Sequence, residues 1–142
     1  MKHLFLFLSL TLLTACSKTD TLNNCNFLLD LGVGVTVNLN LPQFTQLQFT
    51  SNSVYIANQG NGGLIVTNVG SGLRAWDAAD PNHTFTNSCG ILTISGANAS
   101  CNCGDGNEYS LFTGQALNDP LPCGLKEYRV ALTGSNTYYI SN

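Results

Sequence analysis

Two short stretches decide how this sequence is interpreted: Ala79-Asp80-Pro81-Asn82-His83 and Ser100-Cys101-Asn102-Cys103-Gly104. Each follows an apolar run rich in β-branched residues, at a point where a strand is expected to pass into a loop. An aromatic stretch at residues 109–114 comes after the second of them. A Pro-containing stretch at residues 118–122 then leads into residues 125–130.

The rest of the chain shows the periodicity of strands. Apolar residues at alternate positions from 33 to 41 predict a half-buried strand that Pro42 closes. After residue 15 we find no convincing helical pattern, so the sequence predicts an all-β protein. Further strands are expected at residues 54–57, 64–69, 73–77, 91–94, 97–100, 128–132 and 137–140, the last six as three hairpins around glycine-bearing turns.

The order of these features resembles the Rieske iron–sulfur domain: two loops, an aromatic strand, a Pro loop and the L-x-x-Y-x-V strand at residues 125–130. The resemblance covers roughly residue 54 to the C-terminus. It implies a Rieske-like antiparallel β-sandwich, with a larger sheet built from the early and C-terminal strands. It also implies a small subdomain of the cluster-binding type that carries both loops side by side at one tip.

The same resemblance assigns the usual ligand positions. Rieske loops read C-x-H and C-x-x-H, with two thiolates on one iron and two imidazoles on the other. Matched to them, the first loop has Asp80 at the cysteine position and Asn82 at the histidine position. In the second loop Cys101 matches the cysteine and Gly104 the histidine. Since His83 is the only histidine after residue 15, we expect a degenerate site that holds no cofactor.

An alternative is a [2Fe–2S] cluster with mixed ligands, in which Asp80 and His83 join Cys101 and Cys103. Against it, a C-x-C pair is close for ligands of one iron, and we interpret His83 as an ordinary loop histidine. The C-x-C pair could also serve thiol–disulfide exchange, although no flanking Lys, Arg or His is present to lower a thiol pKa.

Other sites in the sequence are less well formed. Asp105, Asn107 and Glu108 could bind Ca²⁺, but their spacing lacks the full oxygen set of a known loop. We interpret Trp76 and the Tyr138-Tyr139 pair as core or sheet-face aromatics. Nothing resembles a nucleophile elbow or an ordered catalytic triad, so no catalytic residue is assigned.

Five cysteines follow residue 16, an odd number. In one branch of the Rieske family a disulfide ties the two cluster loops together. The resemblance therefore implies a Cys89–Cys103 bridge, with Cys89–Cys101 as the alternative. Cys25 and Cys123 could form a second bridge that fixes the N-terminal segment beside the Pro loop, which would leave Cys101 free.

The first residues predict export and lipidation. Residues 1–15 have a positive start and a short apolar run, as in a secretory signal peptide. Residues 13–16 (Leu-Thr-Ala-Cys) resemble a bacterial lipobox, which implies lipidation of Cys16. Residues 16–26 are interpreted as a lipidated tether and 27–142 as the β domain. The serine after Cys16 favours the outer membrane by resemblance to bacterial sorting patterns.

Composition limits the partners. Only 9% of the residues are charged. Without the signal peptide, four basic residues face eight acidic ones, which excludes a basic nucleic-acid-binding surface. We expect a lipid-anchored binding or structural module of the bacterial cell envelope that contacts the membrane through its lipid and has an unidentified protein partner. The alternative is electron transfer through a [2Fe–2S] cluster with unusual ligands.

Overall fold

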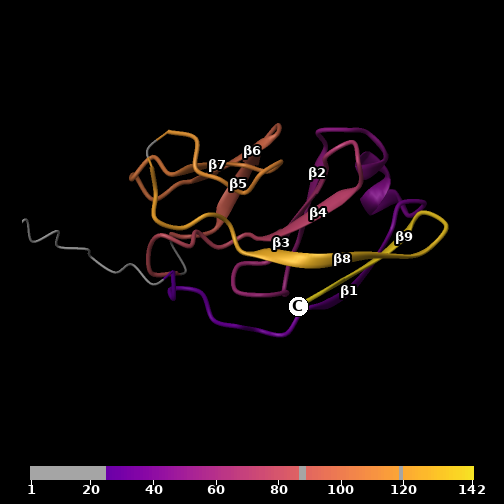
Figure 1. The fold of residues 1–142 in the computed structure, drawn as a ribbon, viewed down its shortest axis with the longest axis horizontal. Coiled ribbons are helices and arrows are strands. Elements are labelled where there is room, and N and C mark those ends of the chain that lie inside the picture. The colour runs from indigo at the N-terminus through magenta and orange to yellow at the C-terminus, as the bar shows by residue number, and fades with distance from the viewer. Residues whose placement is uncertain (1–24, 87–88, 119) are drawn as a thin grey trace, which may run out of the picture.

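The computed structural model describes residues 25–86, 89–118 and 120–142. Within these ranges the chain forms strands and one short 3₁₀ helix (Figure 1). In chain order the elements are β1 (Gly34–Asn38), η1 (Pro42–Gln48), β2 (Ser53–Ile56), β3 (Leu64–Asn68), β4 (Leu73–Asp77), β5 (Leu92–Ser95), β6 (Asn98–Cys101), β7 (Glu108–Ser110), β8 (Glu127–Gly134) and β9 (Thr137–Ser141).

The strands form two antiparallel sheets. A six-stranded sheet has the order β1-β9-β8-β4-β3-β2, and a three-stranded sheet has the order β5-β6-β7. Figure 1 shows the small sheet at one end of the molecule, beyond the end of β4. The larger sheet therefore combines early and C-terminal strands, and the small one carries the two loops, so this expectation is confirmed.

Strand β4 connects the two units through its alternating side chains. Ala75 packs in the core of the larger sheet, with Val37, Leu47 and Ile140. Its neighbour Trp76 packs in the second core, with residues of the small sheet. Successive side chains of a strand point to opposite faces, so one strand can serve both cores. The Trp76 indole Nε1–H also donates a hydrogen bond to the Leu111 carbonyl (2.8 Å).

Two local details differ from the sequence prediction. Helix η1 lies where no helix was expected; it buries Phe44 and Leu47, a spacing of three that suits a 3₁₀ turn but leaves little helical pattern. The aromatic strand expected after residue 109 is short, because β7 ends at Ser110. The chain then turns and reaches Gly114 (φ +74°), where a Cβ would lie 2.7 Å from the Trp76 ring.

The predicted signal peptide, Cys16 and most of the tether lie outside the described residues. In the part of the chain that the structure describes, no helix is long and apolar enough to cross a membrane.

Candidate thiol and metal site at the tip

The two loops meet at one tip of the domain. The first loop runs from the end of β4 to the start of β5, and the second joins β6 to β7. Across them, the Asn107 side-chain amide donates a hydrogen bond to Asp80 Oδ2 (2.9 Å). Within the first loop, the Asp80 backbone N–H donates to the Gly90 carbonyl (2.8 Å). The juxtaposition that the resemblance implied is therefore present.

A buried carboxylate holds the base of the first loop. Asp77 has no exposed surface, and its oxygens accept hydrogen bonds from the backbone N–H groups of Asn61 (2.8 Å), Gly62 (3.0 Å) and Ala79 (2.9 Å). The Tyr128 hydroxyl donates another (2.7 Å). Burial, and next the bond to Asp77, raise the pKa of Tyr128. A carboxylate can be buried here because its oxygens are paired with donors.

A second buried carboxylate lies three residues further along. Asp80 Oδ1 accepts hydrogen bonds from the Tyr109 hydroxyl (2.6 Å) and the Asn82 backbone N–H (2.8 Å), and Oδ2 accepts from Asn107. Burial, followed by the bond to Asp80, raises the pKa of Tyr109. This carboxylate joins the first loop to strand β7 and to the second loop.

The Asn82 side chain is engaged as fully as that of Asp80. Its amide nitrogen donates to the Cys123 carbonyl (2.8 Å) and to the Tyr109 hydroxyl oxygen (2.7 Å). Its oxygen accepts from the Cys123 backbone N–H (3.1 Å). Asn82 therefore fastens the first loop to the Pro loop.

These contacts test whether the usual Rieske positions fit a [2Fe–2S] cluster. The side-chain oxygens of Asp80 and the side-chain amide of Asn82 already form internal hydrogen bonds. Gly104 offers no side chain and occupies a turn with φ +83°. Cys101 is the one thiol among the four positions. The usual ligand set does not fit the cluster.

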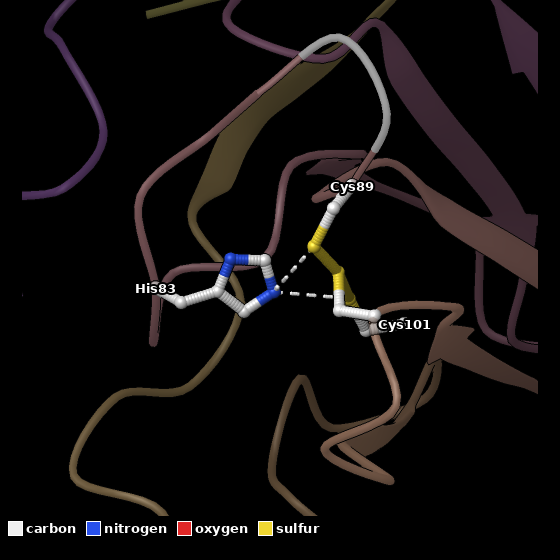
Figure 2. Close-up of side chains that lie close together, drawn as sticks. His83, Cys89 and Cys101 are labelled. Carbon is white, nitrogen blue, oxygen red and sulfur yellow. Dashed lines mark hydrogen bonds between the residues drawn. A yellow bond between two sulfur atoms is a disulfide. The ribbon is translucent and has the colours of Figure 1, made fainter.

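A different set of possible metal ligands, one imidazole nitrogen and three sulfurs, lies beside the usual Rieske positions. Figure 2 shows the His83 ring directed towards the sulfur atoms of Cys89 and Cys101. His83 Nε2 lies 3.0 Å from Cys101 Sγ and 3.8 Å from Cys89 Sγ. The donor atoms of His83, Cys89, Cys101 and Cys103 all lie within 4.8 Å of one another. His83 and Cys89 come from the first loop, Cys101 is the last residue of β6, and Cys103 lies in the second loop.

The structure pairs four cysteines in two bridges. Cys25 is joined to Cys123, with 5.6 Å between their Cα atoms, and Cys89 is joined to Cys103, with 5.2 Å. Cys103 is in bonding contact with Cys101 as well, across a Cα separation of 5.4 Å. Cys101, which these two bridges would leave free, lies against both Cys103 and His83.

The C-x-C pair also has the histidine neighbour that the sequence did not offer. His83 is 18 residues from Cys101 in the chain, so the contact is visible only if the two loops are placed together. The earlier interpretation of His83 as an ordinary loop residue missed this contact. The Rieske resemblance puts the two loops in contact, and this is the sequence signal from which the His83–Cys101 contact could be predicted.

The three residues considered for Ca²⁺ do not present their oxygens together. Asn107 turns its amide nitrogen, not its oxygen, towards Asp80 and Asp105. Glu108 accepts hydrogen bonds from Asn98 and Asn118. The resulting arrangement is a hydrogen-bonded turn.

Comparison with known proteins bears on the fold. No protein-family model matches the sequence, and no curated protein matches it. The chain is similar to one in the complex of reduced oxygenase and oxidized ferredoxin in carbazole 1,9a-dioxygenase (TM-score 0.51, 17% identity, 77% of this chain and 93% of that chain). A putative NADH-dependent nitrite reductase small subunit from Mycobacterium tuberculosis has a TM-score of 0.45, with 18% identity over 80% of this chain and 97% of that one. With the sheet order and the paired loops, the first likeness shows that the chain has a Rieske-like fold.

Proposed function

We propose that this protein is a lipid-anchored module of a bacterial cell envelope, whose Rieske-like domain serves binding or structure without a [2Fe–2S] cluster. The lipobox-like residues 13–16 and the modification expected at Cys16 support the anchor. The sorting pattern after Cys16 supports the outer membrane. The low charge of the chain suits a neutral, polar protein partner better than nucleic acid.

One observation carries the proposal for the tip. Asp80 and Asn82, at two usual ligand positions, hold the tip together through Tyr109, Asn107 and Cys123. Hydrogen bonds and a disulfide therefore perform the structural task for which related loops use a metal cluster. Since a buried acid and a partly buried amide cost free energy unless their polar atoms are paired, these side chains are best explained as structural elements of a cluster-free tip.

Iron and acid-labile sulfide measurements on anaerobically purified, lipidated protein test this proposal. We expect colourless protein with neither iron nor sulfide. Brown protein with two irons and two sulfides per chain would overturn it. Reconstitution with ferrous iron and sulfide under anaerobic conditions serves as the control, because a cluster lost during purification would return while a site unable to hold one would stay empty.

A second candidate is electron transfer through a [2Fe–2S] cluster with unusual ligands. The specific observation in its favour is that His83 and Cys89 from the first loop meet Cys101 and Cys103 from the second. Three sulfurs and one imidazole are suitable donors for such a cluster. When bound, the cluster would supply one-electron transfer. An electron paramagnetic resonance signal in dithionite-reduced protein, lost in His83→Ala, would favour this candidate.

A further inference from the structure

The tip contains four soft or borderline donors that face one another. The His83 side chain is 22% exposed. Its Nε2 atom lies close to Asp80 Oδ2 (3.6 Å) and Asp105 Oδ2 (3.4 Å) as well as to the sulfurs. Cys101 is buried, and Cys89 and Cys103 are partly buried. Sulfur and imidazole donors of this kind select Zn²⁺ and similar ions over Mg²⁺ or Ca²⁺.

The hydrogen bonding of His83 prepares one ring nitrogen for a metal. His83 Nδ1 lies 3.1 Å from the Thr84 carbonyl oxygen. A carbonyl only accepts, so the tautomer with its hydrogen on Nδ1 satisfies this contact and leaves the Nε2 lone pair for a metal. Metal-ligating histidines are commonly oriented by such a bond from the other ring nitrogen.

The four donors are close enough to share one ion once the bonded sulfurs have separated. Ligands about 2.0–2.3 Å from a tetrahedral zinc lie about 3.3–3.8 Å apart, and the four donor atoms here are within 4.8 Å of one another. Three thiolates and one imidazole form a common structural zinc set. The two nearby carboxylates add negative charge around a cation, which favours its retention.

The disulfide decides when the donors are available. Cys103 is joined to Cys89 and touches Cys101, and a sulfur forms only one disulfide at a time. Reduction by a phosphine consumes one water, breaks the S–S bond, oxidises the phosphine to its oxide and leaves two thiols. With Cys101, three thiols then surround His83. Zinc binding releases the three thiol protons to solvent.

We propose that the reduced tip binds one zinc-class divalent ion through His83 Nε2 and the thiolates of Cys89, Cys101 and Cys103, and that the disulfide form does not. This inference rests on the proposed absence of a [2Fe–2S] cluster. It adds a ligand that the proposed function does not name. The tip would exchange a disulfide for a metal as its cross-link between the two loops.

Cobalt titration tests the inference on the full-length protein. Protein reduced with phosphine and desalted anaerobically is titrated with Co²⁺, alongside unreduced protein. We expect one Co²⁺ per reduced chain, with tetrahedral visible bands and sulfur-to-cobalt charge transfer, displaced by Zn²⁺. The unreduced protein should show none of these bands. His83→Ala and Cys101→Ser should weaken binding at least about tenfold, whereas Cys25→Ser with Cys123→Ser should bind like the wild type.

A second measurement needs no variant. Zn²⁺ should slow alkylation of Cys89, Cys101 and Cys103 in reduced wild-type protein, and leave Cys25 and Cys123 unchanged, as read by peptide mass spectrometry. Octahedral cobalt spectra, or equal binding by His83→Ala, would overturn the zinc site while leaving the cluster-free proposal intact. Iron and sulfide in the purified protein would overturn both.

Discussion

Tyr109 donates its hydroxyl hydrogen to Asp80 Oδ1 across 2.6 Å, and both side chains are fully buried. The bond joins strand β7 of the small sheet to the first loop of the tip. Tyr128 and Asp77 repeat the arrangement at the base of that loop, across 2.7 Å. Two buried tyrosine–aspartate pairs therefore anchor the loop, through aspartates that are three residues apart along the chain.

The first prediction concerns the upper pair. Tyr109→Phe should lower the free energy of unfolding by about 1–3 kcal/mol, because Asp80 loses a buried donor while the ring volume is kept. Urea unfolding measures the change. Tyr139→Phe is the matched control. Tyr139 is 42% exposed, so removing its hydroxyl should change the free energy of unfolding by no more than about 0.5 kcal/mol. Equal effects of the two substitutions would contradict the role given to the Tyr109–Asp80 bond.

The second prediction concerns alkaline pH. The pKa values of Tyr109 and Tyr128 are both raised in the folded protein, above the value of about 10 of an unfolded tyrosine. Their contribution to stability is therefore complete below about pH 10 and declines as the pH rises further towards the folded pKa values. The slope should approach about 1.4 kcal/mol per pH unit for each tyrosine.

Urea unfolding between pH 8 and 11 measures that slope. A double variant, Tyr109→Phe with Tyr128→Phe, should be less stable at pH 8 but should lose less stability above pH 10 than the wild type. An unchanged slope in the double variant would assign the alkaline loss to other groups.

The third prediction concerns the bridge between Cys25 and Cys123, which spans 98 residues. Cys25→Ser with Cys123→Ser should lower the free energy of unfolding by about 2–4 kcal/mol, because an unfolded chain without this cross-link gains conformational entropy. Thermal unfolding of the variant and of oxidised wild type gives the comparison. A melting temperature equal to that of the wild type would show that the bridge does not form in solution.

The fourth prediction concerns the anchor. Cys16→Ser should release the protein from the membrane fraction or block its processing, because a short apolar signal segment alone is not a stable anchor. Fractionation of cells, with detection by an antibody, measures the distribution. Cys25→Ser is the matched control and should stay with the membrane. Wild-type fractionation and gel migration of Cys16→Ser would rule out lipidation there.

Much of the fold could be predicted from local sequence. Alternation of apolar residues and the positions of glycine turns depend on a few neighbouring residues, and they marked the strands of both sheets. Helix η1 was not predicted, because this seven-residue 3₁₀ helix buries only Phe44 and Leu47 and so leaves no helical pattern of apolar residues. The loss of the usual cluster ligands was also visible in the sequence, since it follows from residue identity at Asp80, Asn82 and Gly104.

The partners of those residues were decided by tertiary structure alone. Tyr109 meets Asp80, and His83 meets Cys101, only after the small sheet has packed against Trp76 and brought the two loops together. Sequence spacing carries little information about such contacts, because their geometry depends on how two separately formed hairpins are oriented. By itself, the sequence determined the strands, the two loops and the chemical groups they carry. Packing between the two units decided which of those groups face one another.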